Sequence, residues 1–459
     1  MLSSTLLKAL ITLLTARPST AQGIGREQTE NHPKLSWKRC SGTSGTNCTS
    51  VAGELTLDAN YRWIHEKAGY SNCYEGNTWN TRVCANNTDC TAKCVIDGAD
   101  YKRTYGVSAT NNSVTMNFKT YLDYATNVGS KVYLMQDGGD GYEMFRLVGN
   151  EFSFEVDVSK LPCGVAGSSY FVAMPQKGFG TAGARYGTGY CDAQCDRSVK
   201  WINGEANVEG WTPSTNDQYG GVGNKGACCT EVDIWNANSI STAMTAHSCQ
   251  PEGYSVCSGS DCGGTYSTSR YGGSCDPEGC DFNPYRVGVK DFYGPGLKIN
   301  TSKPFTVITQ FVGEGSLLQG IKRFYVQDGK LFANPEPTTP GLSGNAMDQA
   351  WCDAQKVAFK DDVYSFGQHG GMAAVGKGMD VGMVLVMKIW DDYYTNMLWL
   401  DSTLPTTADS NKPGAVRGSC GIDTGEPLQV EAQYPKSAVS FSNIKFGPIG
   451  STFEQPADT

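Results

Sequence analysis

Hydrophobic and polar residues alternate along many short segments of this chain, and long helical repeats are rare. Alternation with a period of two is typical of strands that bury one face. In residues 383–390 four apolar side chains share one face, while Lys388 and Trp390 lie on the other, so we expect a strand with a core face and a functional face. Further strands are expected at residues 131–135, 153–158, 170–174, 305–311 and 441–446.

Turn residues separate these segments. Asp328-Gly329 lies between the alternating residues 323–327 and 330–332 and predicts a β-hairpin, because Asp-Gly accepts the positive φ values of a tight turn. Residues 186–279 are rich in Gly and Cys and are expected to form loops that cover a sheet face. The chain contains no linker rich in Pro, Ser and Thr, so we expect one all-β domain at residues 22–450 and a short polar tail at 451–459.

The composition of the chain excludes several classes of function. The chain has 459 residues and a formal net charge of -9, with 4 His and no run of Lys or Arg. An acidic chain of this kind is unsuited to nucleic acid or an anionic membrane surface. The 18 Cys lack tandem zinc-finger spacing and indicate disulfides formed outside the cytosol. The His residues are far apart in sequence, so we expect no metal site and no cofactor.

The N-terminus is consistent with export. Residues 6–14 are mostly apolar, and Ser19-Thr20-Ala21 supplies small residues, so we predict a secretory signal at residues 1–21. A short buried helix is the alternative interpretation. No other segment has the roughly 18 apolar residues that a membrane helix needs, so a secreted, soluble protein is expected. Four triplets could carry glycans, beginning at Asn47, Asn86, Asn111 and Asn300.

Two carboxylates in one segment are the best candidates for chemistry. On a strand, Glu231, Asp233 and Trp235 would share one face, while Val232 and Ile234 would point into the core. The two acids would lie roughly 6 to 7 Å apart at Cα, and like charges raise the pKa of one of them, which separates a nucleophile from a proton-holding partner. The alternative is two acids on a solvated face.

Three tryptophans indicate a sugar ligand. Trp63, Trp390 and Trp399 lie among polar neighbours, and flat rings suit the apolar faces of glucose units. Any one of them could instead be a core residue, since large aromatic side chains are highly buried on average.

Specific motifs occur at residues 186–195 (YGTGYCDAQC), 206–211 (ANVEGW), Glu231-x-Asp233, 270–273 (RYGG), 390–394 (WDDYY) and 413–418 (PGAVRG). With these motifs, nearly the whole mature chain resembles glycoside hydrolase family 7, the fungal-type cellobiohydrolases and endoglucanases that act on cellulose. The resemblance implies a concanavalin A-like curved β-sandwich (jelly roll). It also implies long, disulfide-stapled loops that roof a substrate tunnel.

The family motif is Glu-x-Asp-x-x-Glu, and its last position here is Asn236. By resemblance Glu231 is the nucleophile, Asp233 assists it, and Asn236 replaces the acid/base. A retaining glycosidase needs two carboxyl groups about 5 to 5.5 Å apart, and an amide cannot exchange a proton near neutral pH. We therefore expect severely impaired hydrolysis. Three explanations stay open: a substitution made to trap substrate, natural divergence, or rescue by another group, for which His247 is the first candidate.

The resemblance assigns further residues. Residues 213–227 and 258–273 resemble loops that cover the tunnel of cellobiohydrolases. The loop at residues 175–183 is shorter than its counterpart in the best-known members of the family, so part of the tunnel roof is expected to be open. Nine disulfides are implied: Cys40–Cys48, Cys73–Cys94, Cys84–Cys90, Cys163–Cys420, Cys191–Cys229, Cys195–Cys228, Cys249–Cys275, Cys257–Cys262 and Cys280–Cys352. Substrate-binding roles are implied for Tyr61, Trp63, Tyr170, Asp192, Gln194, Lys200, His247, Arg270, Trp390, Arg417 and Trp399.

Two functions are therefore expected from this sequence. The first is a monomeric, secreted, retaining β-1,4-glucanase that binds cellulose or cello-oligosaccharides and releases cellobiose from chain ends. The second is a cellulose-binding pseudoenzyme or lectin-like module that holds glucan without cutting it. Both predict binding, so a substrate whose leaving group needs no proton is required to separate them.

Overall fold

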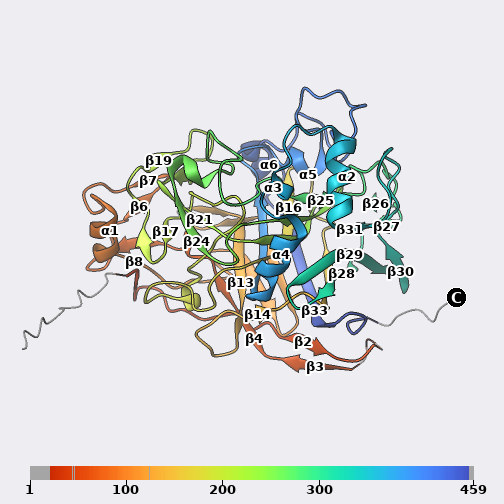
Figure 1. Ribbon diagram of the computed structural model, residues 1–459. Helices are drawn as coiled ribbons and strands as arrows, with labels where there is room; N and C mark the ends of the chain where they lie inside the picture. The colour runs from red at the N-terminus through yellow and green to blue at the C-terminus, as the bar shows by residue number, and fades with distance from the viewer. Residues whose placement is uncertain (1–20, 44, 46, 124, 454–459) are drawn as a thin grey trace, which may run out of the picture.

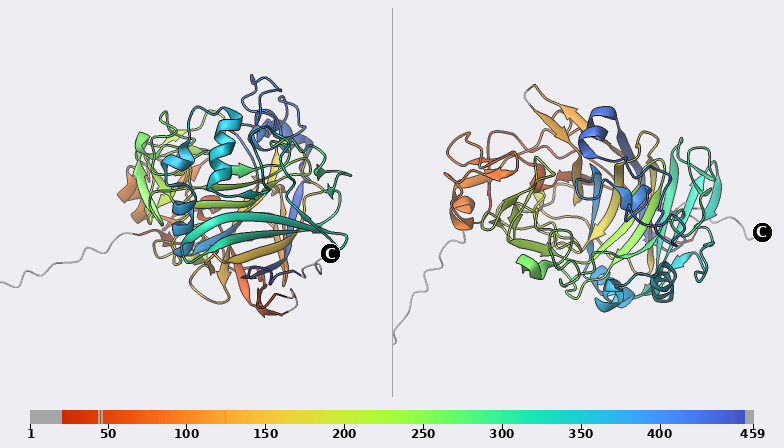
Figure 2. Two further views of the ribbon diagram at one scale, coloured as in Figure 1. Left: turned by 45° about the vertical axis from the view of Figure 1, so that its right-hand side comes forward. Right: turned by 90° about the horizontal axis from the view of Figure 1, so that it is seen from above.

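The computed structural model describes residues 21–43, 45, 47–123 and 125–453. Its main body is two stacked β-sheets, seen in Figure 1 and from two further directions in Figure 2. The ten-stranded sheet contains β3 (Cys48–Val51), β2 (Trp37–Cys40), β33 (Ala438–Pro448), β15 (Asn150–Asp157), β28 (Phe305–Glu314), β29 (Leu317–Gln327) and β30 (Lys330–Ala333), with β10 (Ser113–Asn117), β9 (Val107–Thr110) and β31 (Ala346–Met347) beside them.

The second sheet has eight strands and carries the candidate chemistry. Its order is β25 (Cys280–Phe282), β23 (Thr242–His247), β22 (Glu231–Ala237), β16 (Val165–Val172), β32 (Met383–Asp391), β13 (Ser130–Gln136) and β4 (Gly53–Leu57), with β14 (Met144–Phe145) paired to β32. Apart from β22 and β23, which residues 238–241 connect, these neighbours are distant in sequence, so the segments between them are long and are available to cover the sheet.

Small strand pairs and helices surround the two sheets (Figure 1). The small sheets are β1 (Gly23–Ile24) with β8 (Cys94–Ile96) and β5 (Ile64–Glu66), β6 (Tyr74–Glu75) with β7 (Thr78–Trp79), β11 (Lys119–Tyr121) with β12 (Thr126–Val128), β17 (Trp201–Ile202) with β18 (Glu205–Ala206), β19 (Thr212–Pro213) with β20 (Gly221–Val222), β21 (Lys225–Cys228) with β24 (Ser255–Ser258), and β26 (Tyr293–Gly294) with β27 (Ile299–Asn300). The helices are α1 (Asn87–Lys93), α2 (Gln349–Phe359), α3 (Ser365–Gln368), α4 (Gly371–Asp380), α5 (Leu398–Asp401) and α6 (Pro427–Gln433), with short 3-10 turns at Ala59–Tyr61, Ala184–Tyr186 and Gly259–Cys262.

The all-β prediction is confirmed, and each strand named from the alternating pattern overlaps an observed strand, although the predicted strands at 153–158 and 170–174 extend one and two residues past the ends of β15 and β16. The predicted hairpin is also confirmed: Gln327 pairs with Lys330, and Asp328 and Gly329 have φ values of 50° and 72°. The main core lies between the two sheets. There Phe154 of β15 and Phe305 of β28 meet side chains from the eight-stranded sheet.

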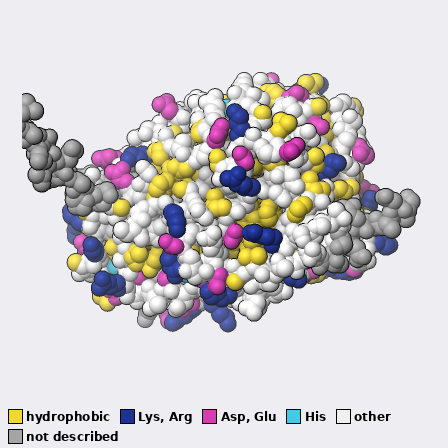
Figure 3. Space-filling model, turned by 60° about the horizontal axis from the view of Figure 1, so that its bottom comes forward, with side chains coloured by type: hydrophobic (Ala, Val, Ile, Leu, Met, Phe, Trp, Pro, Cys, Tyr) yellow, Lys and Arg dark blue, Asp and Glu magenta, His cyan; other side chains and the backbone are white. Residues whose placement is uncertain are grey.

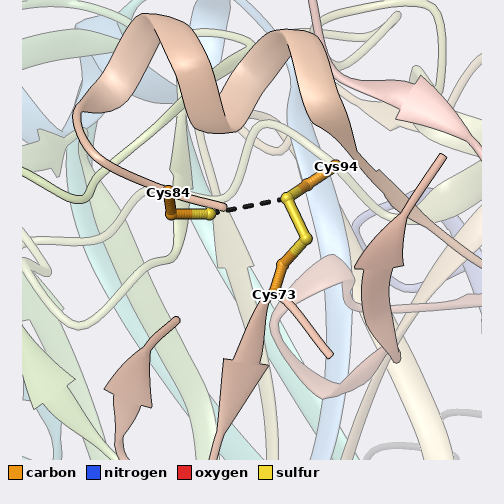
Figure 4. A group of neighbouring side chains, drawn as sticks. All are labelled: Cys73, Cys84 and Cys94. Atoms are coloured by element: carbon orange, nitrogen blue, oxygen red, sulfur yellow. Dashed lines mark hydrogen bonds between the residues drawn. A yellow bond between two sulfur atoms is a disulfide. The ribbon is translucent and has the colours of Figure 1, made fainter. Parts of the chain in front are cut away.

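The nine disulfides implied by the resemblance are all present, and no cysteine of the described residues is free. Cys163–Cys420 joins residues 257 positions apart in the sequence. Near α1, the sulfur of Cys84 lies 3.4 Å from that of Cys94, which is bonded to Cys73 (Figure 4). Because Cys84 is itself bonded to Cys90, this cluster of cysteines consists of disulfides.

The predicted signal segment lies outside the described residues except for Ala21, and most of the predicted tail does too. None of the described helices has the length and hydropathy needed to cross a bilayer. On the face drawn in Figure 3, acidic and basic side chains are interspersed among uncharged ones rather than gathered by sign.

Candidate active site

A β-bulge in β22 brings three motif residues to one face of the eight-stranded sheet. Tyr170 of β16 pairs with Asp233, but Ser169 pairs with Trp235, so β22 contains one extra residue between them. The extra residue reverses the alternation that follows it. Residue 236 therefore lies on the same face as Glu231 and Asp233, which is turned away from the ten-stranded sheet and is called the polar face below.

Trp235 corrects the sequence-based expectation. Strict alternation predicted that it would share a face with Glu231, but it is fully buried in the main core. Its ring centroid lies 5.7 Å from that of Phe305 and 6.4 Å from that of Tyr325, both in the opposite sheet. The prediction was wrong because a period of two does not include a bulge.

Arg323 of β29 supports this bulge from within the core. Its guanidinium donates a hydrogen bond to the carbonyl oxygen of Ile234, the residue beside the irregular pairing. The Arg323 side chain is buried, and its Nε has no partner among the described residues. Sequence reasoning did not select Arg323. The sequence offered one indication of its role: Arg323 is two positions from Tyr325 in an alternating segment, so a charged side chain is expected on the same face of the strand as Tyr325.

Glu231 is half-buried, and its Oε2 accepts a hydrogen bond of 3.0 Å from the backbone N–H of Ala193. Burial and the nearby charge of Asp233 raise the pKa of Glu231 well above its ordinary value, although the charge of His247 opposes them. A carboxyl group of this kind exchanges its proton at a higher pH than an exposed glutamate. The ionisation of Glu231 therefore depends on its neighbours.

His247 lies beside Glu231 and Asp233 rather than beside Asn236. Its Nδ1 donates to the carbonyl oxygen of Asp276 at 2.9 Å, and its Nε2 lies 3.4 Å from Asp233 Oδ2. Burial lowers the pKa of His247, but the hydrogen bond to Asp233 and the charges of Glu231 and Asp233 together raise it to about 10. His247 pairs with Glu231, whereas Asn236 pairs with Ala243, so the two lie about 13 Å apart along the sheet.

Asn236 is 5% exposed, and its side chain makes no hydrogen bond to the part of the chain that the structure describes. Its cross-strand neighbour on β16 is Ser168, and the next residue in that row is Lys388 of β32. An amide in this position can orient a hydroxyl or a glycosidic oxygen but cannot transfer a proton to it.

The predicted aromatic residues lie in two groups. Trp390 and Trp399 are stacked, with centroids 6.3 Å apart and an interplanar angle of 30°, and the Trp390 indole donates to Ser168 Oγ at 2.9 Å. Trp63 stacks on His65 at 4.0 Å, and Tyr61 ends the neighbouring 3-10 turn. The first group lies beside Asn236, whereas the second lies just before β5, where Tyr61 packs against the main core.

Other predicted binding residues surround the polar face. Tyr170 and Tyr190 share a hydrogen bond of 3.1 Å between their hydroxyl groups. Burial and the charge of Asp196 raise the pKa of Asp192 to about 7. Lys200 Nζ donates to the carbonyl oxygen of Asn60 at 2.8 Å.

Gln194 and Arg270 meet at residues 277 and 278. Gln194 Nε2 donates to the carbonyl oxygen of Pro277 at 2.8 Å, and Arg270 Nε donates to Glu278 Oε1 at the same distance. Arg417 donates to the carbonyl oxygen of Trp399 at 3.3 Å.

A segment predicted to cover the tunnel contacts the loop that follows β32. Tyr266, in residues 258–273, meets Tyr394, which follows β32, with ring centroids 5.0 Å apart. Cys191–Cys229 and Cys195–Cys228 hold the loop that carries Asp192 and Gln194 beside the start of β22. Two disulfides therefore fix the loop that carries Asp192 and Gln194 to the residues just before β22.

The chain as a whole is similar to known proteins. The model of the family described as Glycosyl hydrolase family 7 matches residues 24–453. A crystal structure described as a GH7 family cellobiohydrolase from Daphnia pulex is 43% identical, with a TM-score of 0.91, and the match covers 94% of this chain and 100% of that chain.

Two further structures are similar. Cellobiohydrolase from Melanocarpus albomyces, complexed with cellotetraose, is 46% identical with a TM-score of 0.90, and the match covers 95% of this chain and 100% of that one. The native endocellulase EGI of Humicola insolens is 34% identical with a TM-score of 0.79, and the match covers 94% and 100% of the two chains.

Proposed function

Because the chain belongs to glycosyl hydrolase family 7 and has the fold of cellulose-degrading glycoside hydrolases, we propose that it is a retaining β-1,4-glucanase of cellobiohydrolase type with a weakened proton-transfer step. The observation that carries this proposal is the bulge in β22, which gathers Glu231, Asp233 and Asn236 on one face. In this proposal Glu231 is the nucleophile, Asp233 is its electrostatic partner, and the acid/base position is occupied by an amide.

The reaction follows from these groups. Ionised Glu231 attacks the anomeric carbon of a bound glucan, and the bond to the leaving oxygen breaks as the covalent glycosyl-enzyme forms. Asp233, held by His247, controls the charge of Glu231. Without a carboxyl group at residue 236, the leaving oxygen departs unprotonated, and water later attacks the intermediate without a general base. Both steps are slow for an unactivated sugar.

The proposal extends to the substrate and to the mode of action. We propose that a cellulose or cello-oligosaccharide chain lies across the polar face and that cellobiose is released from chain ends. The contact between Tyr266 and Tyr394 supports a covered rather than an open site. The nine disulfides support secretion, with residues 1–21 as the signal and residues 22–450 as a single monomeric domain. Among the four glycosylation triplets, Asn47 and Asn111 are exposed.

Asn236 also favours a second function, in which the protein binds glucan without hydrolysing it. An inactive site would retain the aromatic rings and the hydrogen-bonding groups described above. The two functions differ in one respect: only the first requires Glu231 to react.

The experiment uses 2,4-dinitrophenyl β-cellobioside, whose phenolate leaves without a proton. The hydrolase predicts a burst of dinitrophenolate and a cellobiosyl group attached to Glu231, located by mass spectrometry of a peptic digest. Azide should speed release of the sugar, because this anion needs no general base. Glu231→Gln, which keeps the shape of the side chain, is the matched control and should give neither burst nor adduct.

If the natural chain gives no adduct while it still binds cellotetraose, the hydrolase proposal is wrong and the binding module is correct. If the adduct forms on Glu231, the pseudoenzyme alternative is wrong.

A further inference from the structure

Lys388 is the residue of the polar face whose donors the protein leaves unused. It lies in β32 in the same cross-strand row as Asn236, with Ser168 between them. It is partly exposed, and its Nζ lies 3.7 Å from the centroid of the Trp390 ring. Within the described residues, Nζ has no carboxylate within 4 Å and no hydrogen-bond acceptor.

Other cations near the site are used by the protein. Lys131, the neighbour of Lys388 in the row, lies 2.9 Å from Asp58 Oδ2. Lys200 donates to a backbone carbonyl, and Arg417 does so through one nitrogen, although its buried Nε has no partner among the described residues. An ammonium group has three donors and no acceptor, and leaving them unused in a partly buried place is unfavourable. Among these four cations of the described residues, Lys388 is therefore the one whose charged group makes neither a hydrogen bond nor an ion pair.

The charges around Lys388 come from several elements. Burial and the charge of Lys131 lower the pKa of Lys388 to about 8, while the charges of Asp196, Asp192 and Asp392 oppose this change. Lys388 is thus mostly protonated at neutral pH. The three carboxylates are near enough to influence it but do not pair with it.

We propose that the polar face prefers a glucan chain that carries a carboxylate, with the acidic sugar placed beside Trp390 and Lys388. The inference rests on the proposed glucan-binding function. A neutral pyranose needs a free indole face for stacking, whereas here an ammonium group covers part of Trp390. A carboxylate would accept charge-assisted hydrogen bonds from Nζ, which are about twice as strong as neutral ones, and the apolar face of the same sugar would still contact the remaining ring.

The experiment compares binding of two probes by calorimetry at low salt and neutral pH: cellotetraose, and cellotetraose in which one glucose is replaced by glucuronic acid. We expect the acidic probe to bind about tenfold more tightly, equivalent to about 1.4 kcal/mol. The preference should shrink as salt is added. Binding is measured instead of turnover, so the result does not depend on Asn236.

Three variants make the test specific. Lys388→Met keeps most of the apolar length and removes the charge, so the two probes should bind equally. Lys388→Arg should keep the preference. Lys322→Met, on an exposed part of β29 in the other sheet, is the matched control and should behave as the natural chain. Circular dichroism and the melting temperature establish that each variant is folded.

Each outcome decides the inference. Equal binding of the two probes by the natural chain would overturn it and leave the proposed function standing. A preference that survives Lys388→Met would also overturn it, because another cation would be responsible. If neither probe binds, the proposed function itself fails.

Discussion

Replacing Asn236 by Glu is the perturbation that the site geometry predicts most directly. The bulge leaves four regular steps between residues 231 and 236, or about 13 Å between their Cα atoms. A glutamate carries its carboxyl carbon roughly 3.8 Å from Cα. Side chains on a strand stand roughly perpendicular to the sheet and lean along it, so two glutamates that lean toward each other bring their carboxyl groups closer than their Cα atoms, toward the separation of about 5 to 5.5 Å in retaining glycosidases.

Asparagine ends one bond sooner and carries no exchangeable acid. General acid/base catalysis is worth about 10² to 10⁴-fold, or about 2.7 to 5.4 kcal/mol of barrier. We expect Asn236→Glu to raise the rate of cellotetraose hydrolysis by that factor. For dinitrophenyl cellobioside the rate of the first, bond-breaking step should change little, because its leaving group needs no proton.

The assay measures released cellobiose by chromatography and the dinitrophenolate burst by absorbance. Asn236→Gln is the matched control, because it has the length of glutamate without the acid, and it should give no gain. The reasoning is refuted if Gln and Glu increase cellotetraose hydrolysis equally. It is also refuted if Asn236→Glu leaves that rate unchanged while Glu231 still forms the adduct.

Three further predictions concern the neighbours of Glu231. Adduct formation needs ionised Glu231, so the rate of adduct formation should rise as pH rises through the raised pKa of Glu231. Asp233→Asn removes a charge that raises this pKa, so the acidic limb of the pH profile should move to lower pH. An unmoved or higher limb would contradict this. Arg323→Met should slow adduct formation about tenfold or more with cellotetraose affinity retained, because the carbonyl at the bulge loses its donor; equal loss of affinity, measured by calorimetry, would indicate general unfolding. Asp192 has a folded pKa of about 7 against about 3.9 unfolded, so its folded state binds the extra proton and stability is lost as pH rises between these values. Asp192→Asn should therefore raise the melting temperature by about 2 °C at pH 8 and leave it unchanged at pH 4; the reverse pattern in calorimetric scans would show that the shift has the other sign.

Much of the fold could be predicted from local pattern. Alternation located the strand at residues 383–390 and placed Lys388 and Trp390 on its functional face, because the core selects apolar side chains at every second position. The Asp328-Gly329 turn was predictable because its chemistry is local. The disulfide pairing came from family resemblance, since 18 cysteines allow very many connectivities.

The site itself was only partly predictable. Glu231 and Asp233 were found by spacing, but the place of Trp235 depended on a bulge that no local pattern revealed. The row formed by Asn236, Ser168 and Lys388 depends on the register of three strands that are distant in sequence. The cross-strand register depends on the pairing of all strands in the sheet, so the local sequence pattern of one strand cannot predict it.

The bridge between Cys163 and Cys420 has a consequence for how this protein tolerates damage. A protease that cuts once anywhere between these two cysteines leaves the fragments covalently joined. Such a nicked molecule would migrate as intact on a gel without reductant and would separate into pieces only after thiol treatment. A single cleavage of a loop between these two cysteines would therefore not release either part of the protein.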